Sequence, residues 1–262
     1  KYSLITPISM DHQDYLGNSL LKIAFEKLSI FNNKSINFIN YQKPTVKRFA
    51  KDFINKKKMY AQFAGVDWKI RNQLYIDQDH KINLKYLSLK GYHQFDNAGL
   101  AIAAVKSILK KQFDSNLVEN ALPKIRWAGR LQKIESGKLT KVIHKYDSIF
   151  LDGFHNTDGV KVFINNLKGK NNFLICSFLI NKNYKSILKL LEPYFKKIFV
   201  TPMEEENSIQ VVNVNKTNKI NTSSGLLKSI DDLNRVATSN STIYFGGSLY
   251  FIGEVLKFNK KK

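Results

Sequence analysis

Hydrophobic and polar positions follow two different patterns along the chain, and the change falls in a polar stretch between residues 132 and 146. In the first part, short apolar runs alternate with segments whose apolar residues recur every three or four positions, as on one face of a helix. From 59 to 89 the pattern becomes short, alternating and aromatic, which predicts antiparallel strands with a turn at 77–80. The other strands expected in this part are 3–8 and 35–39, and the expected helices are 19–28, 45–54, 96–109 and 114–122. Asn18 or Ser19 can cap the first of these helices, and Pro44 starts the second.

The second part repeats a strand followed by a helix at regular spacing, which predicts a parallel sheet flanked by helices. The expected strands are 148–151, 172–178, 197–201 and 242–245, and the expected helices are 157–167, 183–191, 224–236 and 248–258. We therefore predict an α/β fold with two domains, 1–138 and 139–262. Ligands of such sheets bind at the carboxyl ends of the strands, which here carry 152–156 and 246–248.

The composition limits the classes of protein to which the chain can belong. Of its 262 residues, 43% are hydrophobic, which is enough to form a sizeable core and excludes a disordered chain. Its apolar runs, such as 173–180, are much shorter than the roughly 20 residues that a membrane-spanning helix needs. The single cysteine, Cys176, excludes an internal disulfide and a multi-cysteine zinc site, and its apolar surroundings indicate packing rather than nucleophilic chemistry. No apolar signal segment opens the sequence, so we expect a cytoplasmic protein with no membrane partner.

The net charge of +21, from 42 Lys and Arg against 21 Asp and Glu, allows two interpretations. Strong positive charge is typical of proteins that bind nucleic acid or anionic membranes. Lysine is nevertheless spread along the chain together with abundant Asn and Ile, and runs of three occur at 56–58 and 260–262. An A+T-rich coding sequence would produce the same bias. A basic scaffold that binds nucleic acid non-specifically therefore stays as the alternative to an enzyme.

Candidate residues of the first part flank two predicted helices. His12 follows the opening strand, where an imidazole can bind a metal ion or a phosphate, and Lys27 lies at the end of helix 19–28. Each also has an ordinary interpretation, His12 as a polar loop residue and Lys27 as a solvated charge at the negative pole of the helix. Asp96 fits as the N-cap of the long helix, and Asn97 in its first turn carries an amide that can read a nucleobase edge.

The other candidates lie near the domain border and the strand ends of the second part. Arg130 has the planar fork that suits a nucleotide phosphate, although a Gly-Arg pair is also common in plain loops. Asp152 and His155 follow a strand, where a carboxylate can accept bonds from ribose and an imidazole can meet a phosphate. Alternatively, Asp152 bonds to loop amides and Asn156 caps the next helix. Ser248 follows two glycines at a strand end, which form either an anion site or a tight turn.

In their order and spacing, these segments resemble folylpolyglutamate synthases, including the bifunctional dihydrofolate synthases, of the Mur ligase superfamily. The matching segments are ITPISMDHQDYLG at 5–17, FEKLSIF at 25–31, HQFDNA at 93–98, GRLQ at 129–132, DGFHN at 152–156 and GGSLYFIGEV at 246–255. The resemblance implies the later part of a central ATPase domain of the Mur ligase type, followed by a Rossmann-like C-terminal domain with a mostly parallel sheet.

The resemblance also implies a reaction and a set of roles. Enzymes of this family use ATP to phosphorylate the carboxylate of a folate, and the amine of L-glutamate then attacks the acyl phosphate. The ATP site is expected between the two domains. By resemblance, His12 is a magnesium ligand, and Lys27 is carbamylated and engages a second metal ion. For ATP, the resemblance implies that Asn97 contacts the adenine, Arg130 the phosphates and Asp152 the ribose. It also implies that His155 is the phosphate-side histidine and that Ser248 lies at the glutamate-side loop.

The sequence departs from the family pattern in several places. It has no Gly-x-x-x-x-Gly-Lys phosphate loop, and it lacks the family's acidic magnesium ligand. Phe154 and Thr157 replace a small residue and a proline, and Asn181 and Asn183 replace aspartates. Because an apolar run follows Lys1 directly, we interpret the chain as N-terminally truncated and expect it to be inactive alone. The expected partners of this monomer are folate or dihydropteroate and L-glutamate, and complementation by a separately encoded N-terminal segment stays open.

Overall fold

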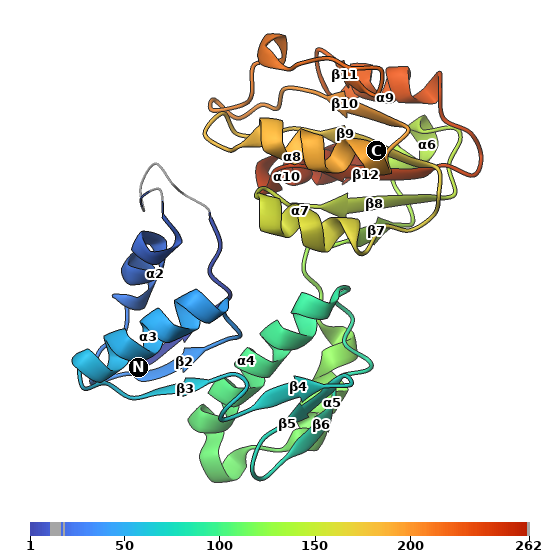
Figure 1. Ribbon diagram of the computed structural model, residues 1–262. Coiled ribbons are helices and arrows are strands. Elements are labelled where there is room, and N and C mark those ends of the chain that lie inside the picture. The colour runs from blue at the N-terminus through green and yellow to red at the C-terminus, as the bar shows by residue number, and fades with distance from the viewer. Residues whose placement is uncertain (11–16, 18, 261–262) are drawn as a thin grey trace. The chain divides into compact units, whose positions relative to one another are not determined.

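The computed structural model describes residues 1–10, 17 and 19–260 (Figure 1). The chain forms two compact units, Lys1–Arg126 and Trp127–Lys262, which are called unit 1 and unit 2 below. The border lies earlier than the one expected between 138 and 139. The reason is strand β7 (Gln132–Ile134), which pairs antiparallel with β8 (Ser148–Asp152) and so joins unit 2. A strand this short shows too little alternation to be predicted from the sequence.

Unit 1 contains a parallel sheet in the order β1 (Tyr2–Ile5), β2 (Ile36–Ile39) and β3 (Ala61–Phe63). Helices α2 (Leu20–Leu28) and α3 (Pro44–Lys56) pack their apolar faces together with Ile5 and Ile39 in one core. Helix α2 begins as expected after Ser19, whose hydroxyl accepts a hydrogen bond from the Lys22 amide. The proline expected to start α3 occupies its first turn.

The second sheet of unit 1 is antiparallel, as the aromatic alternation predicts. Its strands are β4 (Lys69–Arg71), β5 (Leu74–Ile76) and β6 (Lys81–Asn83), with the expected turn between β5 and β6. Helices α4 (Tyr92–Leu109) and α5 (Ser115–Ala121) share a core with this sheet, in which Trp68 and Tyr75 are buried.

Helix α4 begins one turn earlier than the sequence suggests. Its N-cap is Gly91, with a φ of 105°, so the prediction that Asp96 caps this helix is wrong. Asp96 lies inside the helix, and burial raises the pKa of its carboxyl group. Asn97 therefore stands in the second turn, rather than in the first.

The solvent-facing side of α4 is apolar as well as its buried side. Ala101, Val105, Ile108 and Leu109 recur at helical spacing and are exposed, Ile108 to 50%. We call these four residues the outer face of α4. Next to it, α5 completes an apolar groove that also contains Phe113 and Leu117. Within the described residues, no helix is both long and apolar enough to span a membrane.

Unit 2 is a six-stranded sheet in the order β11-β10-β9-β12-β8-β7, parallel except for β7 (Figure 1). Its further strands are β9 (Asn172–Cys176), β10 (Lys197–Val200), β11 (Ile220–Thr222) and β12 (Thr242–Gly246). Its helices are α6 (Lys138–Val142), α7 (Thr157–Ile164), α8 (Tyr184–Leu191), α9 (Leu226–Asn234) and α10 (Leu249–Lys260). Single 3₁₀ turns of the chain lie at Lys110–Gln112, Leu122–Lys124, Glu192–Tyr194 and Val211–Asn213.

Helices cover both faces of this sheet. One core joins α7 and α8 to the sheet, and the other joins α6, α9 and α10 to its opposite face (Figure 1). All five residues of β9 and of β12 are buried, as expected for central strands of a parallel sheet. The α/β fold class and the strand-helix alternation are thus confirmed.

Candidate functional site

The structure brings two of the predicted strand ends together in unit 2. Strands β8 and β12 are parallel neighbours, and the last residue of β8, Asp152, pairs in register with Gly246 at the end of β12. The loops after these strands therefore begin side by side at one edge of the sheet. This is the edge at which open α/β sheets bind ligands.

The carboxylate of Asp152 is hydrogen-bonded to two backbone amides. Its Oδ2 accepts a bond from Leu131 N at 2.9 Å, and its Oδ1 accepts one from Phe154 N at 3.0 Å. The interpretation in which Asp152 bonds to loop amides therefore describes the structure. Each carboxylate oxygen still has a further lone pair, so the group also keeps acceptor capacity for a ligand hydroxyl.

Arg130 lies in a sharply turned loop that these bonds attach to β8. Its neighbours Gly129 and Leu131 have φ angles of 69° and 44°, and the second of these is unusual for a residue with a side chain. Gly129 O accepts a bond from Gly153 N at 2.9 Å, and Gly129 N donates to Gln132 Oε1 at 3.0 Å. The residue on each side of Arg130 is thus held in place by hydrogen bonds.

The charges around Asp152 oppose the effect of its burial. Burial raises the pKa of its carboxyl group, the amide bonds and the charges of Arg130 and His155 lower it, and the result is a pKa of about 6. The bonds from Leu131 N and Phe154 N to Asp152 hold the residues that adjoin Arg130 and His155 at the end of β8. Three predicted site residues are gathered at this strand end.

His155 and Asn156 lead from this loop into α7. His155 Nδ1 lies 3.1 Å from Gly153 O, and because a carbonyl can only accept, this bond requires the proton on Nδ1. The Asn156 side chain accepts a bond from Gly159 N at 2.8 Å and caps α7, as one interpretation of the sequence proposed. The cap fixes where the chain turns after His155.

The glycines after β12 form a tight turn into α10. Gly247 has a φ of 100°, and a Cβ there would lie 2.2 Å from Ser177 O, so only glycine fits. Ser248 is 3% exposed, and its Oγ accepts a bond from Tyr250 N at 3.2 Å. Its hydroxyl thus stabilises the first turn of α10.

The remaining candidates belong to unit 1 or lie outside the described residues. Lys27 is half-buried in the last turn of α2, where the helix dipole favours its positive charge. Asn97 is half-buried in α4, and its Nδ2 lies 3.4 Å from Gln94 Oε1. His12 is outside the described residues. Lys27 is therefore the one predicted metal-site residue that can be examined, and the described residues place no group of acidic or imidazole ligands around it.

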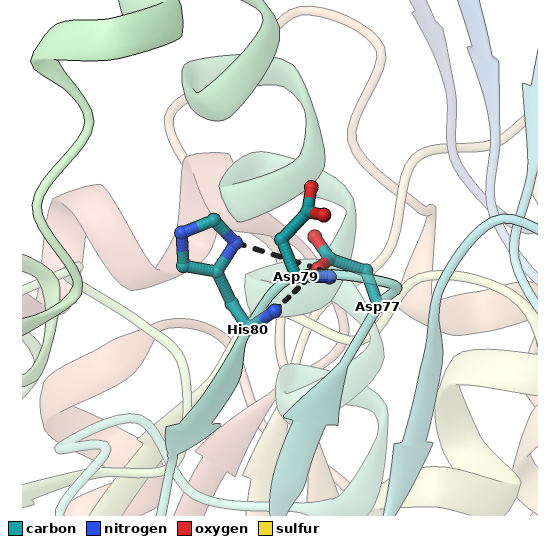
Figure 2. Close-up of side chains that lie close together, drawn as sticks. All are labelled: Asp77, Asp79 and His80. Carbon is teal, nitrogen blue, oxygen red and sulfur yellow. Dashed lines mark hydrogen bonds and ion pairs between the residues drawn. The ribbon is translucent and has the colours of Figure 1, made fainter.

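A different cluster, at the turn between β5 and β6, has the composition of a metal site (Figure 2). Asp77, Asp79 and His80 offer ligand atoms within 4.8 Å of one another. Lys106 of α4 already binds both carboxylates, with Nζ 3.0 Å from Asp77 and 2.7 Å from Asp79. Burial raises the pKa of Asp77, but the bonds from Lys106 and the turn outweigh it and hold the pKa below its usual range. The Lys106 ammonium group thus occupies the position that a metal ion would take, and its two ion pairs join the turn to α4.

Sequence reasoning did not identify the residues that support the Arg130 loop. The amide of Leu131 carries no sequence signal, and Gln132, two residues after Arg130, is a neutral side chain whose type indicates no role in a site. The cluster at the turn between β5 and β6 could be predicted in part from the sequence, because an Asp-x-Asp-His run at a predicted turn is typical of side chains that bond to turn amides.

Comparison with known proteins supports the resemblance. No protein-family model matches the chain. The dihydrofolate synthase/folylpolyglutamate synthase of Mycobacterium tuberculosis is 28% identical over 76% of this chain and 44% of its own length. The protein of that name from Bacillus subtilis is 23% identical over 97% of this chain and 62% of its own length. The chain thus spans less than two thirds of the length of each of these two relatives.

Solved structures agree on the fold. The Mycobacterium tuberculosis folylpolyglutamate synthase complexed with ADP and AMPPCP superposes with a TM-score of 0.83 at 22% identity, over 100% of this chain and 64% of that one. The E. coli FolC structure with DHPP and ADP gives a TM-score of 0.79 at 17% identity, over 98% and 60%. The resemblance to folylpolyglutamate and dihydrofolate synthases, predicted from the motifs, is confirmed.

Proposed function

We propose that the chain is part of an ATP-dependent ligase that joins L-glutamate to a folate or to dihydropteroate through an acyl phosphate. The observation that carries this proposal is the arrangement at the end of β8. A cationic Arg130 in a bonded loop, the Asp152 carboxylate and the His155 imidazole lie together where an α/β sheet binds a nucleotide. The sequence relatives bear names of this activity.

The proposed roles follow the chemistry of each side chain. The Arg130 guanidinium would bind the ATP phosphates, for which its planar fork is suited. Asp152 would accept a ribose hydroxyl with the lone pairs that its amide bonds leave, and Asn97 would read the adenine edge. His155 would act beside the phosphate in catalysis, and the Ser248 turn would lie toward glutamate.

Magnesium is the proposed metal cofactor beside ATP. His12 would be one ligand, and Lys27 would serve after carbamylation, which exchanges its positive charge for a carboxylate. In the described part of the chain, Lys27 has no acidic or imidazole cluster around it. When bound, the metal would neutralise phosphate charge during transfer of the phosphoryl group.

The finer properties of the protein are also proposals. We expect a cytoplasmic monomer that acts on small molecules rather than on nucleic acid. The 262 residues contain no Gly-x-x-x-x-Gly-Lys loop, so we expect no glutamate addition by these residues alone. Adding a separately produced segment equivalent to the uncovered part of the relatives tests whether complementation restores it. Glutamate addition to dihydropteroate or tetrahydrofolate by the 262 residues, at the rate of a complete enzyme, would contradict this expectation.

The experiment that tests the nucleotide site is titration calorimetry with ADP. The chain is expected to bind ADP, and Arg130→Ala is expected to weaken binding by about tenfold or more, since the lost contact is a charge-assisted hydrogen bond. Lys133→Ala, which removes an exposed positive charge from neighbouring β7, is the matched control and should bind as the parent does. Absence of ADP binding, or equal loss in both variants, would refute the proposed site.

A further inference from the structure

The loop that carries Arg130 is held by a hydrogen bond to the side chain of Gln132, a residue to which the proposed function assigns no role. Gly129, the residue before Arg130, is hydrogen-bonded through both of its backbone groups: Gly129 N donates to Gln132 Oε1 at 3.0 Å, and Gly129 O accepts from Gly153 N at 2.9 Å. After Arg130, the amide of Leu131 donates to Asp152 Oδ2 at 2.9 Å. Of these three bonds, the one from Gly129 N is made to a side chain that has no assigned role.

Gln132 is well placed to hold a fixed geometry. It is the first residue of β7, and its backbone is set by pairing with Leu151 of β8. Its side chain is half-buried and reaches back to the residue that precedes Arg130. A side chain fixed on a paired strand restrains a loop better than one that is itself on a loop.

The loop needs such a restraint because its backbone is in a sparsely populated conformation. Positive φ angles at Gly129 and Leu131 surround Arg130, and Leu131 is disfavoured in that region. Without the acceptor of Gln132, the Gly129 amide loses its partner, and the loop is free to relax toward ordinary φ values. The direction in which Arg130 points would change with it.

We infer that Gln132 is a positioning residue that holds the Gly129–Leu131 loop so that Arg130 meets the phosphates of a nucleotide. The inference rests on the proposed function. The role requires only an acceptor oxygen at this position. A glutamate side chain supplies such an oxygen and an alanine side chain does not, so Gln132→Glu serves as the conservative variant and Gln132→Ala as the disrupting one.

The test compares binding of ADP and of adenosine by calorimetry. Gln132→Ala is expected to weaken ADP binding by about tenfold and to leave adenosine binding unchanged, because the loop would act on the phosphates alone. Gln132→Glu should restore ADP binding, and Lys133→Ala should have no effect. In the double variant with Arg130→Ala, the loss should equal that of Arg130→Ala alone, since both changes remove the same contact.

The outcomes separate the inference from the proposed function. No ADP binding by the parent chain refutes the proposed site. ADP binding that falls in Arg130→Ala but persists in Gln132→Ala refutes the inference alone, as does an equal loss of ADP and adenosine binding.

Hydrogen exchange provides a readout that needs no nucleotide. In Gln132→Ala, the amides of Gly129 and Leu131 should exchange at least tenfold faster, while the amide of Ile243 in the central strand β12 keeps its rate. An unchanged exchange rate at Leu131 would show that the loop does not depend on Gln132.

Discussion

Asp152 and Leu131 are joined by a 2.9 Å hydrogen bond from the Leu131 amide to the Asp152 carboxylate, which links the end of β8 to the loop before β7. The same carboxylate accepts the Phe154 amide. Asp152 thus holds two loops at the carboxyl end of β8, the one before β7 and the one after β8. A ligand hydroxyl that donates to Asp152 would meet a carboxylate already held in position.

The pKa of Asp152 predicts a pH dependence of stability. Its folded-state pKa of about 6 exceeds the value of about 3.9 for an unfolded aspartate, so the folded chain binds more protons between these values. The free energy of unfolding should therefore fall by roughly 2 kcal/mol as pH rises from 4 to 7, through this group alone.

The measurement is urea unfolding at several pH values, taken as the difference between the parent and Asp152→Asn. Burial also raises the pKa values of Asp96 and Glu254, but both proteins contain them, so their contributions cancel. A difference that does not vary between pH 4 and pH 7 would contradict the prediction.

The turn after β12 predicts opposite effects for two glycine substitutions. Gly247→Ala places a Cβ against Ser177 O at a φ of 100° and should destabilise unit 2 by about 3 kcal/mol or more. Gly253→Ala, inside α10, meets nothing within 4 Å and should stabilise the chain by about 0.5–1 kcal/mol, because alanine favours a helix. Chemical unfolding of both variants tests this, and a similar loss in each would argue against the tight turn.

The bonds of Lys106 predict that its removal harms unit 1 most at neutral pH. The side chain of Asp77 is 5% exposed, so Lys106→Met leaves a buried carboxylate without its cation and should cost about 1–3 kcal/mol at pH 7. The pKa of Asp77 is lowered by the fold, so this contribution is present above about pH 4 and disappears as the pH falls through the folded-state pKa. Lys111→Met, an exposed lysine nearby, is the control for loss of charge. An equal loss of stability in the two variants at pH 7 would show that the ion pair contributes little.

The outer face of α4 predicts a surface that binds apolar probes. Val105→Ser with Ile108→Gln should lower the fluorescence of a bound hydrophobic dye and reduce aggregation, while each change alters stability by only about 0.5 kcal/mol. Ile102→Ala, at a position 4% exposed on the buried side, should instead cost about 2–5 kcal/mol. Dye binding that is unaffected by the double change would place the exposed apolar surface elsewhere.

The sequence predicted the elements whose signal is local. Ser19 at α2 and Pro44 at α3 start their helices as expected, because a cap or a proline acts on the adjacent turn alone. The same reasoning gave the wrong N-cap for α4. An acidic residue near a helix start, such as Asp96, resembles an N-cap, but the N-cap in the structure is Gly91, which has a positive φ.

Features set by distant contacts escaped prediction. Strand β7 forms by pairing with the edge of β8, and the border of unit 2 therefore lies before β7 rather than after it. The support of Arg130 depends on the Leu131 amide and on Gln132, and neither residue type signals that role. The predicted roles of Lys27, Asn97, Arg130, Asp152, His155 and Ser248 stay predictions, as does that of His12.

The position of β12 has a consequence for synthesis of the protein on the ribosome. Strand β12 is made after the five other strands of the unit 2 sheet, yet it occupies the middle of that sheet, between β8 and β9. Until residue 246 has left the exit tunnel, β7–β8 and β9–β11 can form only as two separate pieces with open edges. Nascent chains of unit 2 therefore complete their folding after translation of β12, and a premature stop before it yields two unjoined half-sheets that are substrates for chaperones and proteases.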